Sequence, residues 1–537
     1  MQLDLRITGC QALTMDPERP TASVIGVWAG RIVGLDEDVA GLPAARTIDL
    51  GGATVLPGFV DAHTHLTWTG VASQLVDLSA CRSKDAVLEA VAGAAAATPD
   101  GRWVDLAGYD QRPLGGHLTW QDLETVVPGR KVFITHVSGH ACLVSRAVLD
   151  LISDDEYAGA APGVETAGDG RPTGLFTEDA MALPRAVRLP LSVQEIVDAI
   201  ETAGRQCLAQ GVTTCADAGI ATGLAGFSPV ELAAYQYALE QGRLPVRVQV
   251  MPPATMLRES GAAPEDGIAR SIDLGMRTGL GSARLAIGAT KLWLDGGMSA
   301  RTAAVSEPYA GDAGLGQLTY SDAELTSLVS DAHRAGWQLA LHAIGDRAID
   351  QAINAVMAAQ TADPRPDARH RIEHAGLVRP DQLQRMAAAG LTAVVQPTFL
   401  RVFGDDYHRL VGERRSKWLY RGRSFLDHGI GLAGSSDRPV SDGAPLRAIQ
   451  QMVQRTSSGG VPIGADESVT VDEALAAYTT GSAYACRMED QVGVLKPGMC
   501  ADLVVLGDDP RHVEAASLAD VPVVATFLDG ELVHGSP

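Results

Sequence analysis

The sequence lacks the usual features of secreted, membrane-spanning and disulfide-bonded proteins. Its first residues have neither a basic start nor a continuous apolar stretch, so we expect no signal peptide. No apolar run reaches the length of about 18 residues that a membrane-spanning helix needs. The seven cysteines are scattered and form no C-x-x-C pair, which favours a reduced, cytoplasmic protein.

Positive charge is also scarce, with 43 Lys and Arg against 65 Asp and Glu and a formal net charge of -22. A surface with this excess of negative charge repels phosphate backbones, so we expect no nucleic-acid partner. The content of 46% hydrophobic and 20% charged residues is typical of a soluble globular enzyme. We expect its substrate to be a small molecule. The oligomeric state is not fixed by the sequence, and a homodimer is compatible with it.

The length of 537 residues exceeds what one ordinary hydrophobic core accommodates, so we expect two structural units. Residues 1–56 contain short alternating apolar segments broken by Gly and Asp, which is typical of antiparallel strands. Residues 488–537 repeat this style. We therefore predict that the two chain ends combine into one small β-sandwich domain beside the main body.

Residues 57–487 alternate between strand-like and helix-like segments. Eight strand candidates end near His63, Asp217, Pro252, Lys291, His342, His374, Gln396 and Asp437. Helical patterns follow several of them, at 322–335, 346–359, 380–389 and 444–455. Eight such units predict an α/β fold of the (β/α)8 TIM-barrel type. A doubly wound sheet is disfavoured because no Gly-rich phosphate turn follows the first strand.

One long insertion, at about 70–190, interrupts this alternation after the first strand. Active sites of such barrels lie at the carboxyl ends of the strands, where this insertion leaves the barrel. We therefore expect the insertion to form part of a lid or a wall of the substrate site.

The strongest local signal is the pair His63 and His65 at the end of an apolar strand. Side chains at positions i and i+2 of a strand share one face, so two imidazoles can bind one ion. A His-x-His pair is weak by itself, but the preceding Pro-Gly-Phe-Val-Asp makes a chance surface pair much less plausible.

Four further polar side chains occupy the same place in their own units, the carboxyl end of a strand. They are Lys291, His342, His374 and Asp437. Strand ends converge on one pocket in a barrel, and burying these groups together without an ion would be costly. The pattern therefore predicts a metal centre rather than a set of polar core residues.

Taken together, these motifs resemble the amidohydrolase superfamily, in particular its amidohydrolase 3 branch, which includes proteins similar to N-substituted formamide deformylases. The resemblance covers nearly the whole chain. It rests on residues 57–65, 291–296, 342–346, 371–374, 436–437 and 493–498. It implies a metal-dependent hydrolase of C–N bonds other than peptide bonds.

The resemblance also implies a binuclear metal centre. It assigns one ion to His63, His65 and Asp437, and a second ion to His342 and His374. Lys291 would bridge both ions after CO₂ converts its amine to a carbamate, that is, as an N6-carboxylated lysine. Zinc is the default ion for a His-rich site with few carboxylates, although iron, manganese and cobalt stay open. In the alternative, Lys291 stays a plain lysine paired with Asp295 or a substrate carboxylate, and one ion is bound.

The implied mechanism is attack of a metal-activated hydroxide on an amide carbonyl, with Asp437 carrying a proton from the water to the leaving nitrogen. We expect an N-substituted formamide or N-acyl amine as substrate. A deaminase or a cyclic-amide hydrolase is the alternative, and a catalytically silent binding module is disfavoured because all six ligand positions are filled. Candidate substrate-contacting residues are His136, His140, Asp295, Arg301 and Gln396.

Overall fold

The computed structural model describes residues 2–136, 141–158, 163–221, 225–311 and 314–536. The chain divides into two compact units. The first unit comprises residues 1–69, 200–226 and 230–537, and the second comprises residues 70–199 and 227–229. Both contain helices and strands, so the predicted α/β class is confirmed.

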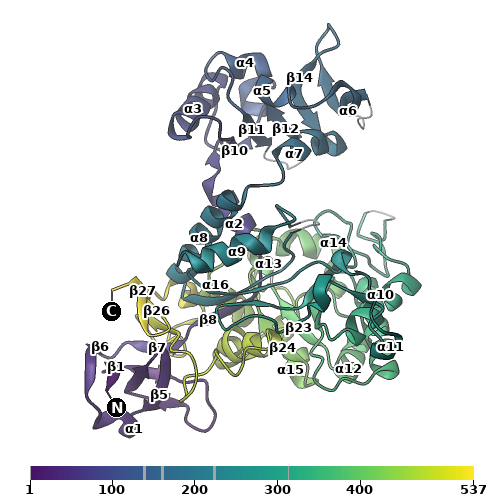
Figure 1. The fold of residues 1–537 in the computed structure, drawn as a ribbon. Helices are drawn as coiled ribbons and strands as arrows, with labels where there is room; N and C mark the ends of the chain where they lie inside the picture. The colour runs from purple at the N-terminus through teal and green to yellow at the C-terminus, as the bar shows by residue number, and fades with distance from the viewer. Residues whose placement is uncertain (1, 137–140, 159–162, 222–224, 312–313, 537) are drawn as a thin grey trace. The chain divides into compact units, whose positions relative to one another are not determined.

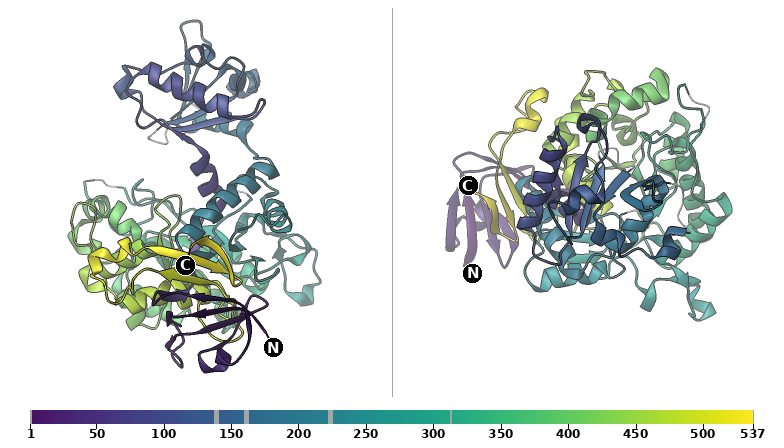
Figure 2. Two further views of the ribbon diagram at one scale, coloured as in Figure 1. Left: turned by 90° about the vertical axis from the view of Figure 1, so that its left-hand side faces the viewer. Right: turned by 90° about the horizontal axis from the view of Figure 1, so that it is seen from above.

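The two ends of the chain form adjoining sheets in the first unit, as the purple and yellow strands of both views in Figure 2 show. One sheet has the order β5 (Arg31–Leu35), β4 (Ile25–Trp28), β1 (Leu3–Thr8), β6 (Ala44–Asp49). The other has the order β27 (Glu531–Gly535), β26 (Val523–Leu528), β25 (Leu503–Leu506), β7 (Thr54–Pro57), β2 (Gln11–Leu13), β3 (Thr21–Ala22). Apolar side chains that alternate along β1 pack in one core with Val505 and Phe527 from the opposite chain end.

Parallel strands make up the centre of the first unit (Figure 1). One parallel sheet has the order β19 (Leu285–Ile287), β16 (Arg247–Val250), β15 (Val212–Asp217), β8 (Phe59–Thr64). The other has the order β20 (Thr290–Trp293), β21 (Leu339–Ala343), β22 (Arg371–His374), β23 (Thr392–Val395), β24 (Gly431–Gly434). Most of their residues are buried, as expected for strands covered on both faces.

Backbone hydrogen bonds join the two parallel sheets at both edges. The strand candidate that was expected to end at Lys291 is split into β19 and β20, and the Lys291 amide donates to the carbonyl of Pro252 at 3.0 Å. At the other edge, the Asp437 amide donates to the carbonyl of His63 at 2.8 Å. The carboxyl ends of β8 and β24 are therefore neighbours, although 373 residues lie between His63 and Asp437.

Helices follow the strands, as labelled in Figure 1. They include α8 (Val193–Ala209), α9 (Glu231–Glu240), α10 (Asp322–Arg334), α11 (Asp346–Ala362), α12 (Pro380–Ala388), α13 (Thr398–Val402), α14 (Gly404–Ser416), α15 (Arg423–Asp427) and α16 (Pro445–Gln454). A capping box of Ser321 and Glu324 starts α10, which buries Leu325 and Val329 on one face. Each of the four predicted helices begins and ends within three residues of its observed bounds. Within the described residues, none of the helices is both long and apolar enough to cross a membrane.

The second unit has its own sheet and core. Its strands have the order β13 (Val164–Thr166), β14 (Pro172–Thr177), β12 (Ala141–Val144), β11 (Val132–His136), β10 (Val104–Tyr109), β9 (Val76–Asp77). Its helices include α3 (Lys84–Ala97), α4 (Trp120–Glu124), α5 (Arg146–Leu149), α6 (Asp154–Ala158) and α7 (Ala182–Arg188). Val91 on α3 packs with Leu106 and Ile134 of the sheet. This unit corresponds to the insertion seen in the sequence.

Candidate metal centre

The pair His63 and His65 lies at the carboxyl end of β8, and both side chains are buried. Both imidazoles point at the same carboxylate. The Asp437 Oδ1 atom lies 3.3 Å from His63 Nε2 and 3.0 Å from His65 Nε2. The spacing of two residues therefore brings both rings to one side of the strand, as predicted from the pleat.

Lys291 on β20 reaches the same place from the other sheet. Its Nζ atom lies 3.4 Å from His63 Nε2 and 5.5 Å from the ring centre of Trp293. Complete burial lowers the pKa of Lys291 to about 8, because an ammonium is poorly solvated there. The fraction of free amine near neutral pH is consequently far larger than for an ordinary lysine.

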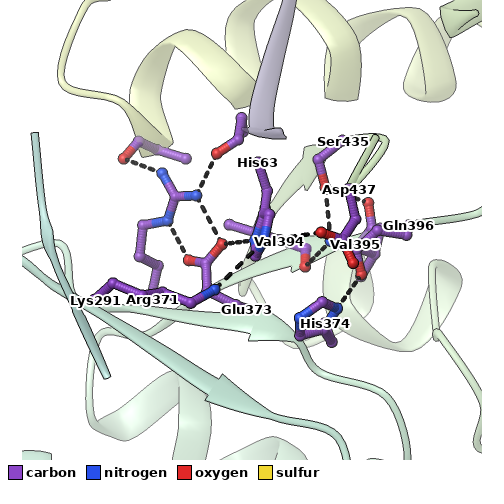
Figure 3. A network of polar contacts seen from close by, with 12 residues as sticks. His63, Lys291, Arg371, Glu373, His374, Val394, Val395, Gln396, Ser435 and Asp437 are labelled. Atoms are coloured by element: carbon purple, nitrogen blue, oxygen red, sulfur yellow. Dashed lines mark hydrogen bonds and ion pairs between the residues drawn. The ribbon is translucent and has the colours of Figure 1, made fainter. Parts of the chain in front are cut away.

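His342 and His374 complete the cluster, part of which is drawn in Figure 3. Their ring centres lie 4.5 Å apart, and those of His374 and His63 lie 5.0 Å apart. Burial lowers the pKa of His374 to about 3 and holds that of His342 well below its usual value, so both rings are neutral and offer a nitrogen lone pair. Ligand atoms of His63, His374 and Asp437 all lie within 4.8 Å of one another. All six predicted ligands thus lie in one cluster, in which His342 is partly exposed, at 12% of its side chain, and the other five are buried.

Two left-handed backbone turns aim ligands into this cluster. Consecutive residues of a strand face opposite sides, so Glu373 and His374 would normally point apart. His374 has a φ of 72° and Ala375 a φ of 44°, and the chain turns there so that the His374 ring faces His63. Asp437 likewise has a φ of 54°. Such conformations cost non-glycine residues about 1–3 kcal/mol each and are common at functional sites.

The buried carboxylate of Asp61 anchors the loop that carries Asp437. It accepts hydrogen bonds from the Ser436 amide at 3.0 Å and the Ser436 hydroxyl at 2.5 Å. The same carboxylate accepts one from the His63 amide at 3.2 Å. The Asp of the Pro-Gly-Phe-Val-Asp motif therefore ties β8 to the segment after β24, a role that the sequence did not reveal.

Asp437 is ionised in this setting. Burial by itself would raise the pKa of the carboxyl group, but the adjacent imidazoles of His63 and His65 hold it well below its usual value. An anionic oxygen is therefore available beside the imidazole nitrogens.

Gln396 and Asp295, two of the residues expected to contact substrate, instead contact candidate metal ligands and backbone amides. Gln396 Oε1 lies 2.7 Å from His374 Nδ1, and Gln396 Nε2 donates to Ser435 Oγ at 2.9 Å. The Asp295 carboxylate accepts hydrogen bonds from the amides of Ala304, Ile344 and Gly345 at 2.8–3.1 Å, and its Oδ1 atom lies 3.5 Å from His342 Nε2. Burial raises the pKa of Asp295 to about 7.

Arg301, His136 and His140 are the other three candidates. Arg301 is exposed and has a φ of 56°, in the loop that follows β20. His136 ends β11 in the second unit, where its Nε2 atom lies 2.6 Å from Gln111 Oε1. His140 lies outside the described residues.

Sequence reasoning missed the charged pair Arg371 and Glu373, which touches the cluster directly (Figure 3). Glu373 Oε2 lies 2.5 Å from His63 Nδ1, and Arg371 donates to both oxygens of Glu373. The signal available in the sequence was the spacing of two residues on a strand, which places both side chains on one face.

Comparisons with known proteins identify the family of the chain. The sequence profile of the Amidohydrolase family matches residues 46–534. The N-substituted formamide deformylase of Arthrobacter pascens is 29% identical, over 98% of each chain. YtcJ of Bacillus subtilis is 29% identical over 92% of this chain and 91% of its own. An uncharacterized metal-dependent hydrolase from Pyrococcus horikoshii superposes with a TM-score of 0.78 at 27% identity, covering 95% of this chain and 99% of its own.

Proposed function

We propose that this chain, which belongs to the amidohydrolase family, is a metal-dependent hydrolase that cleaves the C–N bond of a non-peptide amide. The observation that carries the proposal is the single, largely buried cluster of four imidazoles, one carboxylate and one lysine. The size of this group, collected from four strands and the loop after a fifth, argues against a chance polar core.

We infer that the two parallel sheets form one closed (β/α)8 barrel and that the two chain ends form a β-sandwich. The hydrogen bonds at both sheet edges and the shared core of the end strands support this. The six residues then all lie at the carboxyl ends of the barrel strands, where active sites of this architecture occur.

The donor set fits zinc or a similar divalent cation. Neutral imidazoles and an ionised carboxylate are the ligand forms that such ions require. We assign His63, His65 and Asp437 to one ion and His342 and His374 to a second. Lys291, as a carbamate, would lie between them. A plain Lys291 with one ion is the competing arrangement.

When bound, zinc supplies Lewis acidity, which lowers the pKa of a water and polarises a carbonyl. The residues of the chain do the rest. Asp437 is ionised, so its carboxylate can accept the proton of the attacking water and return it to the leaving nitrogen. Asp295 and Gln396 hold His342 and His374 in place through the contacts described above.

The proposed substrate class rests on similarity to a relative. The similarity to an N-substituted formamide deformylase over 98% of both chains favours an N-substituted formamide or another N-acyl amine. Arg301, His136 and His140 stay candidates for substrate contact. Cytoplasmic location and a homodimer stay predictions from the sequence.

Metal analysis of the purified full chain, with an activity screen, tests the proposal. We expect one or two zinc-type ions per chain and hydrolysis of N-formyl or N-acyl amines that is lost on chelation and restored by metal. Protein free of metal and inactive after loading would refute the proposal. Activity confined to aminated heterocycles or lactams would replace the amide substrate with a deaminase or cyclic-amide function.

A further inference from the structure

We propose that Glu373, held by Arg371, is a positioning residue that fixes the orientation and tautomer of His63 for metal binding. This inference rests on the proposed function. Neither residue is among the six expected ligands, yet both are completely buried beside them (Figure 3).

The Glu373 carboxylate contacts both His63 and Arg371. Its Oε2 atom lies 2.5 Å from His63 Nδ1 and also accepts from Arg371 Nη2 at 2.9 Å. Its Oε1 atom accepts from Arg371 Nε at 2.5 Å. This paired geometry is typical of a guanidinium with an ionised carboxylate, so the proton in the contact with His63 lies on Nδ1.

A protonated Nδ1 leaves Nε2 as the nitrogen that can bind an ion. Nε2 is also the atom that faces the cluster, 3.4 Å from Lys291 Nζ and 3.3 Å from Asp437 Oδ1. The contact therefore selects the correct tautomer and the correct ring orientation together. A carboxylate on the far nitrogen also makes an imidazole a stronger ligand.

Arg371 is fixed independently of Glu373. Its Nη2 atom donates to the carbonyl of Ala62, the residue before His63, and its Nη1 atom donates to the carbonyl of Ala485 at 3.4 Å. Arg371 thus connects β22 to the backbone of β8. It neutralises Glu373 and keeps the carboxylate at a constant distance from the His63 ring.

His374 provides an internal comparison. Its Nδ1 atom has an uncharged partner, Gln396, whose amide orientation is set by donation to Ser435 Oγ. Glu373→Gln would give His63 the same kind of partner as His374, so it removes the charge with little change in shape.

The test measures zinc affinity of the full chain by competition with a chromogenic chelator, and the absorption spectrum of the cobalt-loaded protein. Glu373→Gln should raise the zinc Kd by about 10–100-fold, the usual effect of removing such an outer partner. It should also shift the absorption bands of the bound cobalt, which would stay unchanged if Glu373 had only a structural role. Arg371→Lys, which retains the charge but loses the paired geometry, should raise the Kd by a smaller factor.

Glu467→Gln is the matched control. Glu467 is likewise buried and paired with an arginine, Arg421, and its described contacts include none of the six ligands. Its loss should lower thermal stability but leave the zinc Kd within twofold.

Three results would overturn the inference. The first is a zinc Kd within twofold of wild type in folded Glu373→Gln. The second, if that variant does not fold, is an unchanged Kd in Arg371→Lys. An equal rise in Kd for Glu467→Gln would reduce the effect to general destabilisation. Wild-type protein that binds no zinc would reject the proposed function itself, which separates the two failures.

Discussion

Carboxylation of Lys291 gives the sharpest quantitative prediction, because the pKa of this lysine sets how fast the metal-free protein can react with CO₂. With a pKa of about 8, roughly one lysine in eleven is the free amine at pH 7. An ordinary lysine of pKa 10.5 would have only about 0.03% amine at that pH, some 300-fold less. Burial of the ammonium is the cause of the difference.

The predicted pH dependence follows directly. At constant dissolved CO₂, the rate should rise about fivefold from pH 7 to pH 8 and less than twofold from pH 8 to pH 9, because the amine is then nearly all formed. An ordinary lysine would give about a tenfold rise over each interval.

The assay starts from protein stripped of metal and dialysed free of CO₂. Zinc and ¹³C-labelled bicarbonate are then added, and recovery of hydrolysis is followed with the ¹³C carbamate signal. Lys291→Met is the control and should show neither recovery nor signal. A tenfold rise between pH 8 and pH 9 would contradict the pKa argument, and full recovery without any carbamate signal would favour the single-ion site with a plain lysine.

Three other predictions concern catalysis and stability. Asp437→Asn should lower kcat by about 10²–10⁴-fold with much of the metal retained, and near-normal turnover would reject its role in proton transfer. Burial lowers the pKa of His333 and His370, so in acid the folded state binds fewer protons than the unfolded chain. The contribution of each residue to the free energy of unfolding is therefore fully present above pH 6.5. Below that pH, urea unfolding should show a fall of up to about 1.4 kcal/mol per pH unit for each residue. Unchanged stability between pH 7 and pH 5.5 would contradict this. Arg247 is buried and bonds the Asp502 carboxylate at 2.6 and 2.9 Å. Asp502→Asn removes that charge and should lower the free energy of unfolding by about 3 kcal/mol or more in the same assay. A decrease under about 1 kcal/mol would show that Asp529 suffices as the partner of Arg247.

The gathering of the six candidate ligands was predictable from the sequence because their positions depend on simple rules. His63 and His65 share a strand face through the two-residue repeat, and the other four follow from where strands end. Neither rule requires knowledge of side-chain packing. The helices were predictable for a similar reason, since caps and apolar periodicity are local signals.

The supporting residues could not be predicted, because their roles depend on contacts between distant segments. Gln396 follows a strand as expected, but only the three-dimensional structure shows that its side-chain oxygen contacts the His374 ring. Glu373 precedes His374 in the chain, and strand alternation alone would separate them. The left-handed turn at His374 brings its ring to the side where Glu373 already contacts His63, and no sequence pattern specifies that turn in a non-glycine residue.

The way protons are shared in the cluster is a physical reason to regard it as a cation site. His63 has a carboxylate on each ring nitrogen, Glu373 on Nδ1 and Asp437 on Nε2. The contact at Nδ1 is short, and Arg371 holds the Glu373 carboxylate in place there. The contact at Nε2 is longer, at 3.3 Å, and the same Asp437 oxygen also contacts His65. A polar core built for stability would pair each acceptor closely with one donor. Here the tight pairing lies on the outer side of the ring, and the inner side brings imidazole nitrogens and a carboxylate oxygen together around one point, which is the arrangement that a bound cation stabilises.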